Sequence, residues 1–498
     1  MPLGLVLTAS LALAGAAVAS GQDAPAESQA DGEKLSYVVN TKADAGTIER
    51  VKKEIAKADG TVVTSYEQIG VIVAHSANAG FGDTMRAVEG VDTAGATRTA
   101  PLKAASTTDV GKPKYLKVPK SATGAEAKAA AKAAGEEPLE SLQWDKRIIR
   151  ADEASRISQG SKKVTVGVID TGVDDTHPDL KANFSAGQSA NCVGGKADTS
   201  PGAWRPYTAN DYHGTHVAGI VAAPRNGVGV AGAAPGVKVA SLKVSEEESS
   251  LFFTEAVVCA MVFAADHGVE VTNNSYYTDP WLYNCKDDDD QRALVDAVDR
   301  AAKYATNKGT THVSSAGNSS HDLAAKEIVD DSSPDDSTPV ERTINPAECL
   351  DLPSMLDGVT SVSSTGAKNA KSYFSNYGLN KVDISAPGGD RRYQMPEEPA
   401  KDGGVLSTMP NGDYAYLQGT SMAGPQVAGV AALIKSHHPK ASAQEIAWRL
   451  KAQAMSVTCP EEFDPDGKGT YKADCTGLKG NNSFYGHGIV DALAAVKK

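Results

Sequence analysis

The sequence has 498 residues and a formal net charge of −13, with 41% hydrophobic and 22% charged residues. This length is sufficient for two or three domains, and the composition is that of a globular protein. The acidic balance argues against a nucleic-acid partner, because phosphate binding depends on clustered Lys and Arg. Beyond the N-terminal segment no stretch approaches about 18 uninterrupted apolar residues, so we expect no membrane span.

The first residues have the pattern of a secretion signal. An apolar run in residues 1–19 ends at the small residues Ala17-Val18-Ala19, which predicts cleavage after Ala19 and a secreted, extracellular protein. The segment departs from the usual pattern in having no Lys or Arg before Ala19. The six cysteines form an even set, as expected of disulfides in an exported chain.

A small α+β domain is predicted for residues 34–102. A strand-like run at 34–40, a helical pattern at 47–60, two β-rich runs within 61–76 and a short helix at 83–90 follow the order of a split β-α-β unit. Residues 103–140 are rich in Lys, Ala and Ser and lack an apolar face. This composition indicates an exposed linker.

From residue 160 onward, short β-branched runs alternate with apolar helical stretches. Strands without a polar alternate face, separated by helices, indicate a parallel sheet covered on both sides, which is an α/β, doubly wound fold. In such folds ligands bind beyond the carboxyl ends of the strands. The strands are expected at 163–170, 237–244, 268–275, 311–317, 358–364 and 381–388, and helices at 252–268 and 293–309.

Several residues at these strand ends and at the starts of helices could carry chemistry. Asp170 ends a strand, His213 and His216 lie in the first turn of an apolar helix, Asn318 follows a strand, and Ser421 opens another apolar helix. Taken singly, each has a structural alternative: a turn Asp, a core His, and a Ser that caps its helix. The two histidines lack the intervening Glu of the zinc-protease helix motif.

The combination of these residues resembles the subtilase family of subtilisin-like serine proteases. The matching stretches are VGVIDTGVDDTHPDL, DYHGTHVAGIVAA, SSAGN, ISAPGG, GTSMAGPQVAG and GHGIVDALAAV, in family-like order over about 160–498. The resemblance implies that Asp170, His213 and Ser421 form the catalytic triad and that Asn318 supplies an oxyanion donor. It also implies a catalytic domain over 141–498.

The resemblance further implies how the protein is made and used. Residues 34–102 look like the family's propeptide, an inhibitor and folding aid, with the maturation junction in the linker at 103–140. We therefore expect a secreted serine endopeptidase made as a zymogen, monomeric, without an organic cofactor, acting on protein or peptide substrates. Two alternatives stay open: a dedicated processing protease for one class of precursor, and an inactive scaffold used for binding. Such a scaffold would be expected to lack a triad member, and none is missing here.

A structural calcium ion is the one cofactor that the resemblance implies. It places Asp179 and the loop after the His213 helix where the family has its high-affinity calcium site. Asp179 would give a carboxylate and Asn226 an amide oxygen, with the carbonyls of Pro224, Val228 and Val230 completing an oxygen cage. The alternative is an ordinary Gly-rich turn.

Cysteine pairing is open from the sequence alone, since six cysteines allow 15 connectivities. Cys459 and Cys475 bracket a short polar loop and are the safest pair. For the other four, we prefer Cys285 with Cys349 and Cys192 with Cys259. The first of these pairs is preferred because both of its cysteines follow strands expected to border the cleft.

Substrate preference is the property that the resemblance does not carry over. Where the family usually has Ser-Leu-Gly on the strand lining the S1 pocket, this chain has Ser275-Tyr276-Tyr277. Residues 321–351 hold nine Asp or Glu against two Lys or Arg, and residues 287–290 add four Asp. We hypothesise that this acidic rim attracts peptides with Lys or Arg near the scissile bond, while Tyr277 narrows the cleft. The alternative is a solvated loop without a role.

Overall fold

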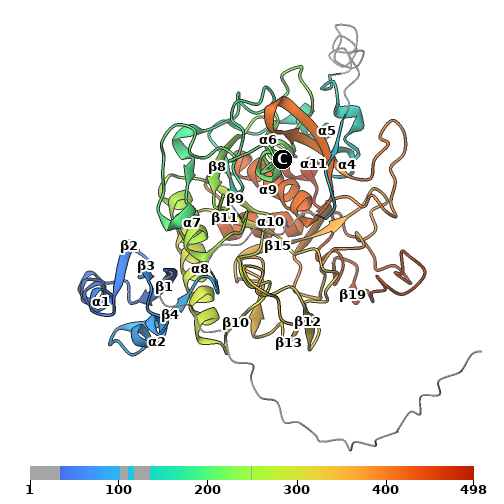
Figure 1. Ribbon diagram of the computed structural model, residues 1–498. Helices are drawn as coiled ribbons and strands as arrows, with labels where there is room; N and C mark the ends of the chain where they lie inside the picture. Colours follow the sequence, from blue (N-terminus) through green and yellow to red (C-terminus); the bar gives the residue numbers. More distant parts are fainter. Residues whose placement is uncertain (1–33, 101–109, 117–134, 248, 498) are drawn as a thin grey trace, which may run out of the picture.

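The computed structural model describes residues 34–100, 110–116, 135–247 and 249–497 (Figure 1). The predicted signal segment 1–19 and the parts of the linker at 101–109 and 117–134 lie outside these residues. A small sheet domain at the N-terminal side precedes a large α/β domain. Within the described ranges, no helix has both the length and the apolar character needed to cross a bilayer.

The small domain is a four-stranded antiparallel sheet with two helices, in the strand order β2-β3-β1-β4. Its first helix is amphipathic, with buried Ile48, Val51 and Ile55 one to two turns apart. The Asp44 side chain caps this helix by accepting the Thr47 N–H at 2.8 Å. The elements are β1 (Leu35–Thr41), α1 (Ala45–Lys57), β2 (Gly60–Tyr66), β3 (Val71–Ser76), α2 (Phe81–Arg86) and β4 (Val91–Ala96).

Both faces of the small sheet are covered. Tyr37 and Val39 of β1 belong to the domain's own core, against its two helices. Val38, between them in sequence, points to the other face and shares a core with residues of the large domain. The small domain is therefore packed through an apolar surface onto the large one.

The centre of the large domain is a seven-stranded sheet in the order β16-β15-β11-β9-β6-β8-β7. Every pairing in this sheet is parallel, which confirms the predicted doubly wound α/β fold. Six of the strands coincide with the six predicted runs, and the two-residue β7 is additional. The strands are β6 (Thr165–Asp170), β7 (Ala190–Asn191), β8 (Lys238–Lys243), β9 (Val271–Asn274), β11 (Thr311–Ser315), β15 (Val359–Thr365) and β16 (Ile384–Pro387).

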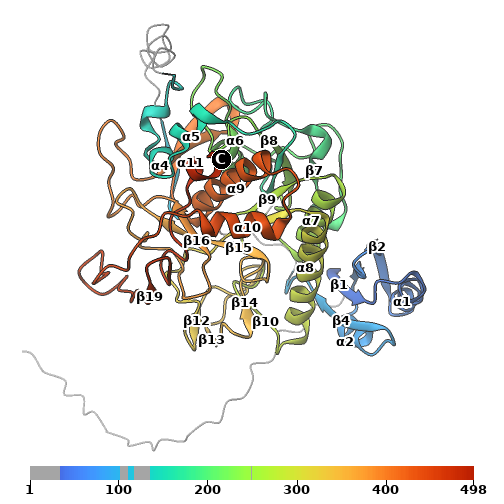
Figure 2. The ribbon, with the colours of Figure 1, turned by 180° about the vertical axis from the view of Figure 1, so that it is seen from behind.

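Helices cover both faces of this sheet, which explains why its strands lack a polar face. In β6, Val166 and Val168 point to one core and Ile169 to the other. One face carries α6 (His213–Ala222) and α9 (Thr420–His437), with α4 (Trp144–Ile148), α5 (Ala151–Ile157), α10 (Ala443–Ala452) and α11 (Ala492–Val496) around them (Figure 2). The other face carries α7 (Thr254–Asp266) and α8 (Asp289–Lys308), beside which the small domain lies (Figures 1 and 2).

A hairpin that is not among the predicted elements lies next to this sheet. It consists of β17 (Val405–Met409) and β18 (Asp413–Leu417), and β18 also pairs with β5 (Lys114–Tyr115). The short strand β5 comes from the predicted linker, so this part of 103–140 is anchored rather than exposed along its whole length. Leu139, near the linker's other end, is also buried.

Three disulfides link the large domain, and all three preferred pairs are confirmed: Cys192–Cys259, Cys285–Cys349 and Cys459–Cys475. The Cys285–Cys349 bridge joins two short strands that pair with each other. The remaining short elements are β10 (Asn284–Cys285), β12 (Ile328–Asp330), β13 (Arg342–Ile344), β14 (Cys349–Leu350), β19 (Gly477–Leu478) and β20 (Asn481–Asn482).

Candidate active site

Polar residues gather where the parallel strands of the large sheet end. Asp170 is the last residue of β6, Ser275 directly follows β9, and Asn318 lies three residues after β11. Because β6, β9 and β11 are neighbouring parallel strands, their carboxyl ends share one edge of the sheet. The helices α6 and α9 begin with His213 and Thr420-Ser421 at this edge.

Asp170 and His213 form a buried pair. The His213 Nδ1 atom lies 2.8 Å from Asp170 Oδ1 and 2.9 Å from Oδ2. Asp170 is fully buried and also accepts the Thr171 N–H at 2.7 Å. The Thr171 hydroxyl in turn accepts the Gly214 N–H at 3.0 Å, which fixes the start of α6 against the end of β6. The imidazole is thus oriented by a carboxylate that is itself held in place.

Ser421 lies within the first turn of α9 and does not cap it. The cap position is Gly419, and the Thr420 N–H at the helix end is accepted by Asn318 Oδ1 rather than by Ser421, so the alternative of a capping Ser421 is wrong. The Ser421 hydroxyl instead donates to the carbonyl oxygen of Ser275 at 3.3 Å, and the Ser275 hydroxyl donates to the Ser421 carbonyl at 3.0 Å. The hydroxyl therefore faces the end of β9 rather than the axis of its own helix.

The Asn318 amide has a fixed orientation. Its Oδ1 accepts both the backbone N–H and the hydroxyl of Thr420, each at 2.8 Å. The Thr420 hydroxyl also accepts the Gly317 N–H at 3.2 Å. These bonds tie the loop after β11 to the residue before Ser421, and they turn the Asn318 amide nitrogen away from Thr420.

A cavity of about 210 Å³ opens beside Ser421. The three residues predicted to line a substrate pocket all contribute to it, but their side chains differ in role. Tyr276 is buried, with its ring stacked on Phe252 at 5.0 Å between centroids, so it supports the wall. The Tyr277 hydroxyl donates to Asp335 Oδ2 at 2.7 Å. The lining includes Ser275, Tyr276, Tyr277, Asn318, Asp351 and Ser421.

Comparison with known proteins agrees with this geometry. A model of the subtilase family matches residues 161–488, which is more than half of the chain. The chain belongs to the subtilase family. Members of this family are serine endopeptidases, so the protein is a hydrolase that cleaves peptide bonds. The match covers all the strands and helices that position Asp170, His213, Asn318 and Ser421.

Individual subtilases show how far the similarity extends. Subtilisin DY from Bacillus licheniformis is 30% identical over 70% of this chain and 97% of its own sequence. The thermophilic serine proteinase of a Bacillus strain is 32% identical over 57% of this chain and 55% of its own. The crystal structure of the epidermin leader peptide processing serine protease from Staphylococcus aureus shares the fold with a TM-score of 0.63, at 24% identity over 93% of this chain and 98% of its own.

The second histidine of this subtilase's α6 is a core residue rather than a metal ligand. His216 is fully buried, and its Nε2 lies 3.0 Å from the carbonyl oxygen of Ala415 in β18. Burial lowers the pKa of His216 to about 3, so the ring stays neutral. The i, i+3 spacing of His213 and His216 is therefore not that of a metal-binding pair. His213 contacts Asp170, whereas His216 contacts a backbone carbonyl in the core.

The predicted calcium loop lies against a buried carboxylate. Asp179 is fully buried, and its Oδ2 accepts the Val230 N–H at 2.8 Å, while its Oδ1 has no hydrogen-bond partner among the described residues. Burial, with Glu137 nearby, raises the pKa of Asp179 to about 8. Asn226 Oδ1 accepts the Val228 N–H at 2.8 Å. A buried carboxylate oxygen without a donor fits an oxygen cage for a hard cation.

Glu137 is a further acidic residue at this loop, and no sequence pattern indicates it. It faces the backbone N–H groups of Gly227 and Val228, and its Oε2 is buried without a hydrogen-bond partner among the described residues. Glu137 lies in the stretch predicted to be an exposed linker, where an acidic residue next to another, Glu136, is expected and does not indicate a buried ligand. Its oxygen is a further candidate ligand beside Asp179.

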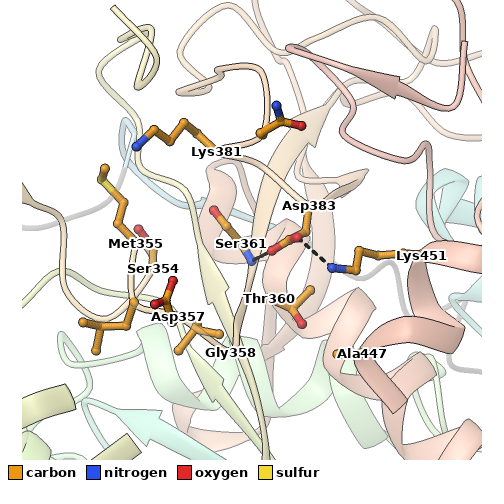
Figure 3. Close-up of a pocket in the computed structure, with 13 residues that line it drawn as sticks. Ser354, Met355, Asp357, Gly358, Thr360, Ser361, Lys381, Asp383, Ala447 and Lys451 are labelled. Atoms are coloured by element: carbon orange, nitrogen blue, oxygen red, sulfur yellow. Dashed lines mark hydrogen bonds and ion pairs between the residues drawn. The ribbon is translucent and has the colours of Figure 1, made fainter. Parts of the chain in front are cut away.

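A separate depression at the opposite edge of the sheet has no part in this site. Figure 3 shows it at the start of β15 and just before β16, with Asp383 between Ser361 and Lys451. The Asp383 carboxylate accepts the Ser361 N–H at 3.0 Å and pairs with the Lys451 ammonium at 3.1 Å. These central polar groups are thus satisfied by one another.

Proposed function

We propose that this subtilase hydrolyses peptide bonds with Asp170, His213 and Ser421 as its triad and Asn318 as an oxyanion donor. The Ser421 hydroxyl attacks the substrate carbonyl as His213 takes its proton, and His213 then gives that proton to the leaving amine. Asp170 holds the imidazole tautomer and stabilises the imidazolium. In the second half of the reaction, His213 takes a proton from water as the water attacks the acyl-enzyme, and then gives a proton to the Ser421 oxygen as the acid product leaves.

The observation that carries this proposal is the buried Asp170–His213 pair, at 2.8 Å, at the same sheet edge as the Ser421 hydroxyl. A carboxylate with only a structural role could accept hydrogen bonds from backbone N–H groups alone. Asp170 instead contacts the His213 imidazole and orients it. The experiment is hydrolysis of casein and of a peptide library by the secreted protein. Cleavage of both supports a broad endopeptidase, cleavage of few library sequences supports a processing protease, and cleavage of neither supports a binding scaffold.

Asn318 offers a direct test of the oxyanion proposal. We expect Asn318→Ala to lower kcat by about 10²–10³ with little change in KM, the size known for the corresponding Asn donor of subtilisin. Asn318→Asp is the matched variant, because it keeps an oxygen for the two Thr420 donors and replaces the amide NH₂ group with a carboxylate oxygen, which cannot donate to an oxyanion. A drop of similar size in both variants supports the donor role. A drop in Asn318→Ala alone would indicate that the Thr420 contacts are what matter.

We also propose that residues 34–102, of which the structure describes 34–100, act as an inhibitory propeptide of a secreted zymogen. The support is the contact that its last described residues make with the catalytic domain. Arg98 donates to Glu255 at 2.7 Å, and the Thr99 N–H donates to Asp336 Oδ2 at 2.7 Å. Asp336 adjoins Asp335, which holds Tyr277 of the substrate pocket. The chain thus leaves the small domain next to the cleft.

The maturation cut is expected before residue 135. Residues 135–144 are anchored in the catalytic domain: the Leu139 N–H donates to the Gly229 carbonyl at 2.7 Å, and the Trp144 indole donates to the Gly404 carbonyl at 2.8 Å. Loss of these residues would expose the surface of the catalytic domain that the buried side chains of Leu139 and Trp144 now cover. This narrows the expected junction to 101–134.

Calcium is proposed as a structural ion held by Asp179 and the 224–230 loop, with Glu137 as a further ligand. The ion would cancel the charge of buried carboxylates and tie the loop to the body of the domain. Asn226 and the carbonyls of Pro224, Val228 and Val230 remain the other proposed ligands.

Removal of calcium is expected to lower the stability of the Ser421→Ala protein, which cannot digest itself. At free calcium of about 100–1,000 times Kd the ion contributes roughly 3–4 kcal/mol, so chelation should lower the Tm by several degrees. Asp179→Asn should abolish the response to the chelator, and Asp198→Asn, at an exposed carboxylate, should keep it. Equal Tm values with and without chelator in the parent protein would contradict the site.

A further inference from the structure

The cavity beside Ser421 contains a buried carboxylate, that of Asp351. The residue is 2% exposed, and its Oδ1 has no hydrogen-bond partner among the described residues. Burial raises the pKa of Asp351 well above the usual range of a carboxyl. Burying an acid without a cation or a full set of hydrogen-bond donors destabilises the fold. A carboxylate kept in a pocket at this cost suggests a functional role.

The position of Asp351 is fixed by its neighbours in the chain. Two residues earlier, Cys349 is bonded to Cys285. The Leu352 carbonyl accepts the Thr278 N–H at 2.9 Å, and Thr278 directly follows Tyr277 of the pocket wall. Asp351 is therefore held between two tethers, next to the strand segment that carries Ser275–Tyr277.

Gly317 gives this carboxylate access to the cavity. The glycine also lines the cavity and has a φ of 98°, a conformation that favours glycine. A Cβ at this position would lie 3.4 Å from Asp351 Oδ2 and 2.4 Å from Asn376 Nδ2. A side chain at 317 would thus fill the space beside Oδ2, and its absence keeps that space open.

Three other acids of the 321–351 insertion, Asp330, Asp335 and Asp336, already have partners in the protein. Asp330 pairs with Arg342 at 2.7 Å, Asp335 accepts the Tyr277 hydroxyl, and Asp336 accepts the Thr99 N–H. The run at 287–290 does not line the pocket either, since Asp288 caps α8 and Asp290 pairs with Arg86 of the small domain at 2.8 Å. The hypothesis of a general acidic rim therefore needs correction for these residues.

We propose that Asp351 is the specificity-determining residue of the S1 pocket and pairs with Arg or Lys immediately before the scissile bond. The assignment rests on the proposed function, because that substrate residue enters the cavity beside the attacking Ser421. A guanidinium or ammonium would supply the missing donors and the opposite charge, which makes the ionised carboxylate favourable. The substrate would complete a buried ion pair of which the protein holds one half.

The test compares two peptides that differ only in arginine or its neutral isostere citrulline before the cut. The ratio of their kcat/KM values cancels every contribution of the triad. We expect the mature enzyme to favour arginine by roughly 10²-fold or more, as for a desolvated charge pair, and to keep this preference at high salt, because buried pairs are weakly screened. Asp351→Asn should bring the ratio to about 1 while citrulline peptide cleavage continues.

Asp331→Asn is the matched control, since it removes an exposed charge from the same insertion, and it should leave the ratio unchanged. If Asp351→Asn does not fold, Asp351→Ser and the wild-type ratio still decide. An active wild-type enzyme with a ratio near 1, or with a preference for aromatic residues, would overturn the assignment alone. Failure of the wild type to cleave any peptide would overturn the proposed function and this assignment together.

Discussion

Ser421→Ala is expected to abolish peptide hydrolysis, with a loss in kcat of about 10⁶, the size known for removal of the corresponding Ser in subtilisin. The reason is that no acyl-enzyme can form without the hydroxyl, whatever the state of His213. The fold should be retained, because Ser421 lies in a buried helix where Ala is compatible with both packing and helix propensity. The measurement is steady-state hydrolysis of a peptide substrate beside a circular dichroism melt.

The same variant should also remain full length after signal removal, since its own cleavage within 101–134 would be lost. The measurement is N-terminal sequencing of secreted wild-type and Ser421→Ala protein from a host without other extracellular proteases. It shows whether residues 20–100 are still present in each protein. Ser436→Ala, a change near the far end of the same helix α9, is the control and should mature normally. Normal maturation of Ser421→Ala would refute self-processing.

Asp170→Asn is expected to lower kcat by about 10⁴, the effect of the analogous change in a chymotrypsin-like protease. An amide at this position keeps the size of the side chain but can present its NH₂ group to His213 Nδ1, which favours the wrong tautomer. In the native protein both carboxylate oxygens lie close to Nδ1, at 2.8 and 2.9 Å, and can accept its proton in a hydrogen bond.

The measurement for Asp170→Asn is the value of kcat/KM and its dependence on pH. Loss of the stabilising carboxylate should leave a small activity that increases at alkaline pH, where hydroxide can replace the base. Asp174→Asn serves as control, because Asp174 lies on the same loop but bonds to Thr176 and Asn411 instead. A loss below about tenfold in Asp170→Asn would exclude the proposed role of this carboxylate.

The sequence predicted the central sheet because its strands are buried on both faces. Runs such as Val166–Ile169 consist of apolar or small residues throughout, a pattern that partly exposed strands do not have. The triad candidates were also recognisable, since each stands in a distinctive local stretch. What connects them in space, the parallel order β9-β6 and β11-β9, is a consequence of the fold and cannot be read from any one stretch.

The features that the sequence did not predict depend on tertiary contacts. The β17–β18 hairpin is short, and its partner β5 lies about 300 residues earlier in a Lys- and Ala-rich region. No local sequence pattern therefore indicates this three-stranded sheet. The alternative that Ser421 caps its helix, which the preference of Ser for that position suggests, is wrong because Gly419 takes the cap position and the Ser421 hydroxyl donates to the Ser275 carbonyl. The burial of the Glu137 and Asp351 carboxylates depends on residues that are distant in the sequence, so it could not be predicted from the local sequence.

Covalent labelling with a fluorophosphonate probe tests whether Ser421 is the activated nucleophile, since the probe reacts with an activated serine and the modified peptide can be located by mass spectrometry. The chain has many serines, and Ser421 is the one proposed to be activated. We predict a single adduct on Ser421 of the mature protein, absent from Ser421→Ala and strongly reduced in Asp170→Asn. No adduct, or an adduct on another serine with Ser421 unmodified, would contradict the account.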